Sequence, residues 1–168
     1  MTIGILERRR IEAEFAKAIL EEFSAEIGEA RASEILSRAV VKLARQAAAA
    51  FAAESDPKKS PIENFAAIQH HWTKDDALAI EVVARTDTQF DFNVTRCRYA
   101  ETYRAMGIGH LSAVLSCNRD GAFCEGFHPD LKLTRTQTIA GGATHCDFRY
   151  RLEPPAAEVS EAGAGPRR

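Results

Sequence analysis

The sequence has no long apolar run and no surplus of either charge. Its longest apolar stretch, around residues 47–53, is far too short to cross a bilayer, which takes about 20 apolar residues. The 22 lysines and arginines are balanced by 24 aspartates and glutamates, for a net charge of -2. Proteins that neutralise many phosphates usually carry a basic surplus. We therefore expect neither a membrane nor a nucleic acid as a partner.

The sequence also has few cysteines, and none are spaced as a Cys-x-x-Cys pair. Zinc-ribbon and thioredoxin interpretations therefore lose their main support. A secretory signal is absent as well, because the arginines at 8–10 follow a short apolar stretch instead of preceding it. These absences predict a cytoplasmic protein with reduced thiols and without a cofactor.

What remains is the composition of an ordinary globular protein, with 45% hydrophobic and 27% charged residues in a chain of 168. That length predicts one domain, which we place at residues 1–153. Within it, residues 5–75 are predicted helical and residues 78–152 rich in sheet. The tail, residues 154–168, lacks apolar periodicity and is predicted to be disordered.

Three helices are predicted in the first half. Apolar residues recur at steps of three and four over residues 6–23 and 30–53, and Gly28 suits the break between them. Residues 60–63, Ser-Pro-Ile-Glu, have the pattern of a helix start, and this third helix is predicted to end near Trp72. The apolar faces of the first two helices favour a homo-oligomer formed through them.

The second half changes to the period of a strand. Residues 78–85 and 90–96 are rich in β-branched and aromatic residues, and residues 131–139 and 145–152 alternate similarly. Between these pairs, residues 97–115 return to helical spacing. We therefore predict an α+β fold in which N-terminal helices are followed by an antiparallel sheet, with this central helix packed on it.

Candidate catalytic side chains gather in that second half. Cys97 and Glu101 lie four residues apart on a predicted helix, so they share a face. Cys117 and Asp120 lie three apart where Gly121 suggests a loop opening. A cysteine attacks only as a thiolate, so it needs a base or a positive neighbour. Each residue also has a plainer interpretation, since a lone cysteine usually packs as a small apolar group and a helical glutamate is usually solvated.

Four segments together resemble the L-2-amino-thiazoline-4-carboxylic acid hydrolase family. They are Arg-Cys-Arg-Tyr-Ala-Glu at 96–101, Ser-Cys-Asn-Arg-Asp at 116–120, Leu-Thr-Arg-Thr-Gln-Thr-Ile-Ala-Gly-Gly at 133–142 and Cys-Asp-Phe-Arg-Tyr at 146–150. The helical first half fits the family's layout but carries no sharp motif. The resemblance implies a hydrolase of a small cyclic amidine, in which water adds to the ring carbon between nitrogen and sulfur. The ring then opens to N-carbamoyl-L-cysteine.

The resemblance supplies positions, and chemistry suggests roles for them. Glu101 and Asp120 are candidate partners for a protonated amidine. Cys117 is a candidate nucleophile that attacks the ring carbon directly. Alternatively, Asp120 or a histidine activates water as a general base. Both routes are open at this point, and the predicted catalytic residues are Cys117, Asp120 and Glu101.

The remaining candidates would bind a small-molecule substrate. Arg135 offers a bidentate fork for a substrate carboxylate, and Thr136 and Thr138 offer hydroxyl donors on the same segment. The predicted substrate-binding residues are Arg135, Thr136, Thr138, Tyr99, Cys97 and Cys146.

Two alternatives accompany this hypothesis. Cys97, Cys117, Cys146 and a histidine could converge on zinc, although short ligand spacing is lacking, and no metal is predicted. The chain could also be a small-ligand-binding or sensory domain that keeps the pocket without catalysis. The hydrolase and the sensory domain differ in one feature: only in the hydrolase do we expect Glu101 and Asp120 to face one cavity together with a competent thiol.

Overall fold

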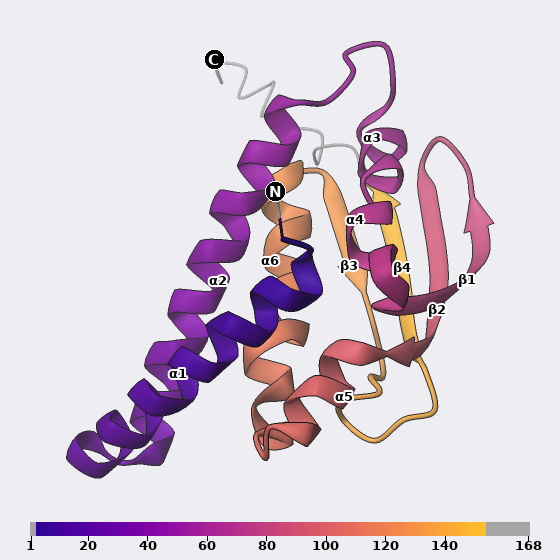
Figure 1. Ribbon diagram of the computed structural model, residues 1–168. Helices are drawn as coiled ribbons and strands as arrows, with labels where there is room; N and C mark the ends of the chain where they lie inside the picture. The colour runs from indigo at the N-terminus through magenta and orange to yellow at the C-terminus, as the bar shows by residue number, and fades with distance from the viewer. Residues whose placement is uncertain (1–2, 154–168) are drawn as a thin grey trace, which may run out of the picture.

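The computed structural model describes residues 3–153, and the predicted disordered tail, residues 154–168, lies outside them. Two long antiparallel helices, α1 (Ile5–Ile27) and α2 (Glu29–Ala53), open the fold (Figure 1). A single residue, Gly28, separates them at φ 83°, a backbone conformation that glycine adopts without steric cost. The sequence-based prediction of two helices divided at this glycine is confirmed.

The next helices are short. α3 (Pro61–Ala67) begins with a capping box in which the Ser60 hydroxyl accepts a bond from the backbone N–H of Glu63, and the Glu63 carboxylate accepts one from the Ser60 N–H. The helix does not continue to residue 72 as predicted. A turn separates it from α4 (His70–Thr73), and a 3₁₀ turn over Lys74–Asp76 then leads into the sheet.

The sheet has four antiparallel strands in the order β1-β2-β4-β3. They are β1 (Leu78–Arg85), β2 (Gln89–Cys97), β3 (Leu131–Thr134) and β4 (Cys146–Leu152). The period-two pattern therefore predicted three of the strands to within a residue at each end. The fold is α+β with the N-terminal helices preceding the sheet, as the sequence predicts.

The segment between β2 and β3 differs from the prediction. The single helix expected over 97–115 is instead α5 (Arg98–Ala105), followed by a 3₁₀ turn at Gly109–Leu111 and a π-helical turn at Ala113–Cys117. The π-helical turn runs straight into α6 (Asn118–Phe127). The loop opening expected beside Gly121 is therefore continuous helix.

Strand β3 is also shorter than predicted, because the chain leaves the sheet after Thr134. The loop that follows is held by Asp147 on β4, whose carboxylate accepts bonds from the backbone N–H groups of Thr136 and Gln137. This departure brings Arg135 to the π-helical turn and α6, where it bonds to the Cys117 carbonyl and to Asp120.

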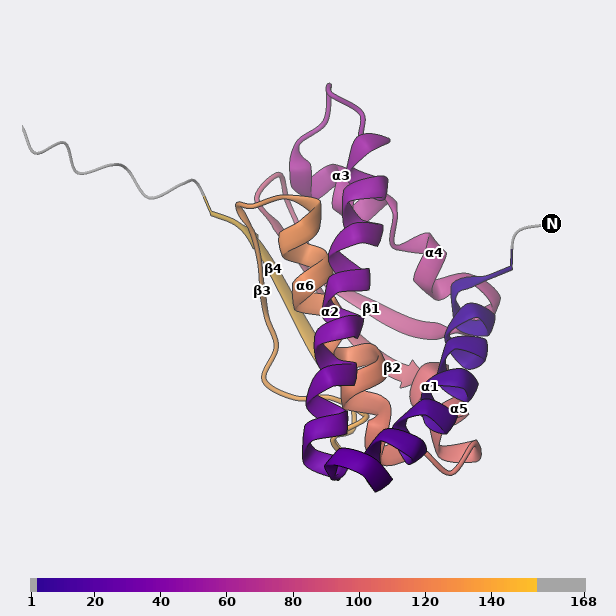
Figure 2. The same cartoon turned by 90° about the vertical axis from the view of Figure 1, so that its left-hand side faces the viewer.

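The helices cover one face of the sheet in two layers. Figures 1 and 2 show α6 against the strands with α2 lying over it. A Cβ at Gly126 would lie 2.9 Å from the Arg45 Cα, so α2 and α6 approach closely at this glycine. The helix on the sheet is thus α6: it packs against β3, and its residues Phe123 and Phe127 contact Phe65 of α3 within the larger apolar cluster.

Two apolar clusters form the core. The larger lies between the sheet, α3, α6 and α2, and it is rich in phenylalanine. The smaller joins α1 and α2 to α5 and includes Tyr99, Tyr103 and Leu111. Trp72 and Leu78 pack against both clusters. The seam between the clusters is where the candidate site lies.

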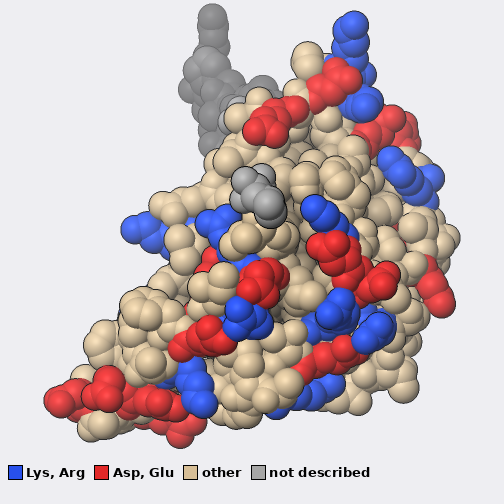
Figure 3. Space-filling model, in the orientation of Figure 1, with Lys and Arg blue, Asp and Glu red and all other residues tan. Residues whose placement is uncertain are grey.

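The outer surface of α1 is strongly charged. Ion pairs at helical spacing join Arg10 to Glu7 and Glu14, and Arg8 to Glu12. Figure 3 shows acidic and basic side chains interspersed on this face of the molecule. In the described part of the chain, no helix has the length and apolar content that crossing a membrane requires.

Candidate active site

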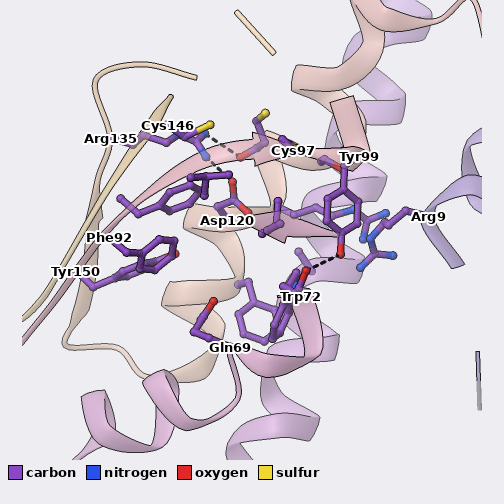
Figure 4. Close-up of a pocket in the computed structure, with 18 of the residues that line it drawn as sticks. Arg9, Gln69, Trp72, Phe92, Cys97, Tyr99, Asp120, Arg135, Cys146 and Tyr150 are labelled. Atoms are coloured by element: carbon purple, nitrogen blue, oxygen red, sulfur yellow. Dashed lines mark hydrogen bonds and ion pairs between the residues drawn. The ribbon is translucent and has the colours of Figure 1, made fainter. Parts of the chain in front are cut away.

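A small cavity of about 110 Å³ lies at the seam between the two apolar clusters. Helices, strands and the loop after β3 all contribute to its wall, which is mostly aromatic and aliphatic (Figure 4). The polar or sulfur-containing lining residues are Arg9, Gln69, Trp72, Cys97, Tyr99, Ser116, Cys117, Arg119, Asp120, Arg135, Cys146 and Tyr150.

One helical face supplies much of this wall. Ser116, Arg119, Asp120 and Phe123 recur at steps of three and four residues, so they point the same way from the π-helical turn and α6. A π-helical turn is uncommon and is often found at functional sites. Because the turn continues into α6 without a break, Cys117 joins the same face.

Asp120 and Arg135 form an ion pair at one end of the cavity. The Nη1 of Arg135 donates to the Asp120 Oδ2, and its Nη2 donates to the Cys117 carbonyl at 3.1 Å. The same guanidinium lies 5.0 Å from the centre of the Phe148 ring. These contacts hold Arg135 in place and leave it engaged by protein groups.

Asp120 is the acid of the cavity wall. Its side chain is half-buried, with 30% exposed, and it lines the cavity. The partial burial of the carboxyl raises the pKa of Asp120 above its ordinary value, and the positive charge of Arg135 offsets part of that increase. A carboxyl with a raised pKa beside a partly enclosed cavity is suited to accepting and returning a proton.

Three thiols lie on the cavity wall, on Cys97, Cys117 and Cys146. Burial raises the pKa of each, that of Cys117 to about 12. At neutral pH these thiols are therefore uncharged and poor nucleophiles. The cavity's lining in the described residues includes no histidine, so the structure brings no imidazole base to these thiols.

Glu101 lies away from the cavity on the outer surface of α5. Its carboxylate accepts two bonds from the Arg96 guanidinium, at 2.9 and 3.1 Å, and its side chain is 45% exposed. The hydrogen bonds from Arg96 hold the pKa of Glu101 below its ordinary value. Cys97 is the last residue of β2, so the shared helix face expected for Cys97 and Glu101 does not form.

The two threonines also lie off the cavity lining. The Thr136 hydroxyl donates to Asp147 at 2.6 Å, and the Thr138 hydroxyl accepts from the backbone N–H of Gly141 at 3.0 Å. Both bonds shape the loop after β3. Of the residues predicted to bind substrate, the cavity thus brings together Arg135, Tyr99, Cys97 and Cys146, but not the threonines.

An open groove of about 590 Å³ lies behind the same wall. Cys117 and Arg135 line both the groove and the cavity, whereas Thr138 lines the groove but not the cavity. The cavity and the groove are thus neighbours separated at this wall by side chains.

Sequence reasoning missed several polar residues of the wall, most notably Arg9 and Arg119. Arg119 stands inside the Ser-Cys-Asn-Arg-Asp segment, and its helical spacing with Ser116 could have indicated that it faces the site. Arg9 comes from α1, more than 100 residues away in the chain, and no local pattern marks it. Among residues 3–153, no three His, Cys, Asp or Glu side chains are grouped so that they could hold a metal ion.

Comparisons with known proteins found a matching family and a solved structure of similar fold. A family model described as L-2-amino-thiazoline-4-carboxylic acid hydrolase matches residues 8–150. No curated protein matches the chain significantly. Among solved structures, the phenol-responsive sensory domain of the transcription activator PoxR, crystallised with phenol, is similar in fold. Its TM-score is 0.54 at 11% sequence identity, over 80% of this chain and 71% of that one.

Proposed function

The chain belongs to the L-2-amino-thiazoline-4-carboxylic acid hydrolase family, and on that premise we propose that it hydrolyses a small cyclic amidine. The carbon attacked is the one bonded to nitrogen and sulfur in an isothiourea ring. The name-giving substrate of the family is the first candidate, and related rings of similar size are others.

One observation carries this proposal: the Asp120 carboxyl faces a partly enclosed, mostly apolar cavity and is held there by Arg135. A carboxylate in such a place can pair with a protonated amidine or take a proton from water. Exclusion of bulk solvent strengthens both interactions. Burial raises the pKa of Asp120, which makes the carboxylate a better base.

The cavity's volume supports a small ring. An engineered protein cavity of about 150 Å³ binds benzene, so about 110 Å³ limits the buried part of a ligand to one small ring. Phe92 and Tyr150 provide flat apolar surfaces on one side (Figure 4), and Phe148, which stacks on Phe92, also lines the cavity. The uncharged thiols of the wall suit contact with a ring sulfur.

The reaction that we propose uses water as the nucleophile. Asp120 accepts a proton as the water oxygen bonds to the ring carbon, and a tetrahedral intermediate forms. The bond from that carbon to sulfur then breaks as the added hydroxyl becomes a carbonyl and gives its proton to the ring nitrogen, and the proton held by Asp120 passes to the departing sulfur. The products are a carbonyl group and a thiol, and Asp120 returns to its starting state.

Direct attack by Cys117 is the less favourable route. With a pKa of about 12, about one thiol in 10⁵ is ionised at neutral pH. Burial is the main cause of this raised pKa, and the negative charge of Asp120 contributes to it. The covalent alternative therefore starts from a far smaller reactive fraction than the water route.

The experiment is incubation with L-2-amino-thiazoline-4-carboxylate and with related cyclic amidines, followed by mass spectrometry of the products. Hydrolysis adds the mass of one water and creates a free thiol. We expect product with the wild type and with E101Q, and a large loss with D120N. A well-folded wild-type protein that converts none of these rings would refute the proposal.

A second candidate is a ligand-binding sensory domain. The observation in its favour is the similarity in fold to a sensory domain crystallised with phenol, together with this chain's aromatic cavity and uncharged thiols. A sensory domain would be stabilised against heat by phenol or a similar ring and would convert none of the cyclic amidines. Turnover of an amidine would decide against this candidate.

A further inference from the structure

Two buried arginines meet at the end of the cavity opposite Arg135. Arg9 on α1 and Arg119 on α6 both line the cavity, with side chains 15% and 12% exposed. Figure 4 shows Arg9 beside Tyr99, on the far side of the view from Arg135. Guanidinium groups are costly to bury, so each needs an anionic or acceptor partner.

A single carboxylate serves both of them. The Glu12 Oε2 accepts from the Arg9 Nη1 at 2.5 Å and from the Arg119 Nη2 at 3.0 Å. Its other oxygen accepts from Arg8, a more exposed residue, at 3.2 Å. One acid is thus shared by three arginines, two of which face the cavity.

The charges around the cavity do not cancel. Its lining holds the guanidinium groups of Arg9, Arg119 and Arg135 and the carboxyl of Asp120. With Glu12 added, three positive charges face two negative ones, which leaves one positive charge. This excess lies at the Arg9 end, because Arg135 is paired with Asp120.

The two arginines also retain donors. Within residues 3–153, Arg9 hydrogen-bonds through Nη1 alone. Arg119 uses its Nε toward the Leu115 carbonyl and its Nη2 toward Glu12. The Nε and Nη2 of Arg9 and the Nη1 of Arg119 therefore remain for another acceptor. Burial and the nearby Arg9 lower the pKa of Arg119 to about 10, so Arg119 is still charged at neutral pH.

We propose that Arg9 and Arg119 form an anion subsite that binds a carboxylate carried by the ring in the cavity. This subsite deepens the proposed function, on which the identity of the ring rests. It selects small ring carboxylates over neutral rings of the same size. It also assigns the substrate carboxylate to these two arginines instead of Arg135, whose guanidinium is engaged by Asp120 and the Cys117 carbonyl.

The test measures binding without hydrolysis. 2-Aminothiazole-4-carboxylate and 2-aminothiazole are aromatic rings that resist the addition of water, and they differ only in the carboxylate. Calorimetry with the full chain gives the affinity of each. We expect the acid to bind about 10- to 100-fold more tightly, the range for hydrogen bonds to charged groups.

Variants locate the preference. R9M and R119M should each reduce the ratio of the two affinities to within about threefold and leave binding of the neutral ring nearly unchanged. R10M is the matched control, because Arg10 lies next to Arg9 in α1 but pairs with Glu7 and Glu14 at the surface. R9K should restore part of the preference by restoring the charge.

A Glu12 variant distinguishes anion binding by Arg9 and Arg119 from a purely structural role of these arginines. It competes with the ligand for the same donors, so E12Q should tighten binding of the acid and leave the neutral ring unaffected. Thermal unfolding identifies variants that do not fold, and R9M decides the question if R119M is one of them.

Equal affinity of the wild type for the two rings, no binding of either, or an unchanged preference in R9M would overturn the subsite. These outcomes are separate from those of the hydrolysis assay. A protein that shows the preference but converts no amidine would lack the proposed activity and keep the subsite. One that converts amidines with and without a carboxylate equally well would have the activity and lack the subsite.

Discussion

Asp120 and Glu101 are alike in the sequence and opposite in the structure. Both are acids in segments shared with the family, and each pairs with an arginine nearby in the chain, Arg135 or Arg96. Asp120 faces a partly enclosed cavity, whereas Glu101 lies on the outer surface of α5. The difference shows that the surroundings of a carboxyl group, more than its type or sequence context, decide what it can do.

The direction of the two pKa shifts expresses the same difference. For Asp120, burial is the larger influence and raises the pKa despite the positive charge of Arg135. For Glu101, the hydrogen bonds from Arg96 dominate and lower the pKa, because water still surrounds the group. An acid of the first kind keeps its proton to a higher pH than an ordinary carboxyl and is a stronger base once ionised, whereas one of the second kind stays ionised to a lower pH.

The largest expected effect comes from exchanging each acid for its amide. D120N should reduce kcat on the best cyclic amidine by about 10²- to 10⁴-fold, the usual contribution of a general base. E101Q should keep kcat within about twofold of the wild type. Steady-state kinetics on both proteins, with circular dichroism to verify folding, measure the contrast. Equal losses in the two variants would remove the distinction drawn here.

The next largest expected effect is a difference in stability between variants of Arg135 and Arg96. R135L leaves the buried carboxylate of Asp120 without its partner, which we expect to cost about 2–3 kcal/mol at pH 7. R96L should leave the unfolding midpoint near that of the wild type, since surface ion pairs contribute little. Urea unfolding of both variants provides the measurement.

The pH dependence of R135L gives an internal check. Without Arg135, the folded-state pKa of Asp120 rises further above its unfolded value of 3.8. The folded state then binds more protons, so stability falls as pH rises from 3.8 through the folded-state pKa. The defect of R135L should therefore shrink at pH 5. A defect independent of pH would point to lost packing of the guanidinium on Phe148.

The pH–rate profile should also depend on the Asp120–Arg135 pair, and we expect a smaller effect there than on stability. The acid limb of kcat/KM should have its midpoint above 3.8, because Asp120 acts as a base only after losing its proton at a raised pKa. R135L should move this limb to higher pH, and R96L should leave it in place. A limb that moves only in R96L would instead assign the base to Glu101.

Among the cavity residues, the smallest expected change in kcat is that of C117S. Burial raises the pKa of Cys117 to about 12, so its thiol is uncharged at neutral pH. The water route uses no thiolate, and kcat of C117S should stay within about threefold of the wild type. C124S is the matched control, since that buried thiol donates to the Leu131 carbonyl and lies off the cavity lining. A loss approaching that of D120N would revive covalent attack by Cys117.

Strand β1 shows where sequence patterns were sufficient. Its bounds, Leu78–Arg85, were predicted correctly, because clustered β-branched residues favour extended backbone. Helix α6 shows where they were not. Asp120 and Gly121 suggested a loop, yet the segment is helical because Phe123 and Phe127 bury their rings against Phe65 of α3 within the larger apolar cluster. Tertiary packing outweighed the weak local propensity of a glycine.

The same contrast holds for the candidate site. The family segments pointed to Cys117, Asp120 and Arg135, which do meet at the cavity. They also pointed to Thr136, whose hydroxyl serves the loop instead. Arg9 was missed, because its part in the wall depends on α1 packing beside α5 and the π-helical turn, and no spacing within α1 records that contact.

The sequence by itself determined the periods of the helices and strands, the break at Gly28, and the kinds of chemistry that the second half can offer. These are properties of neighbouring residues, since backbone preference and the spacing of apolar side chains act over a few positions. Only the tertiary structure decided which acid is buried, which thiols are uncharged and which arginines border the cavity. Burial and charge depend on groups far apart in the chain, and those groups become neighbours only when the two apolar clusters close around the seam.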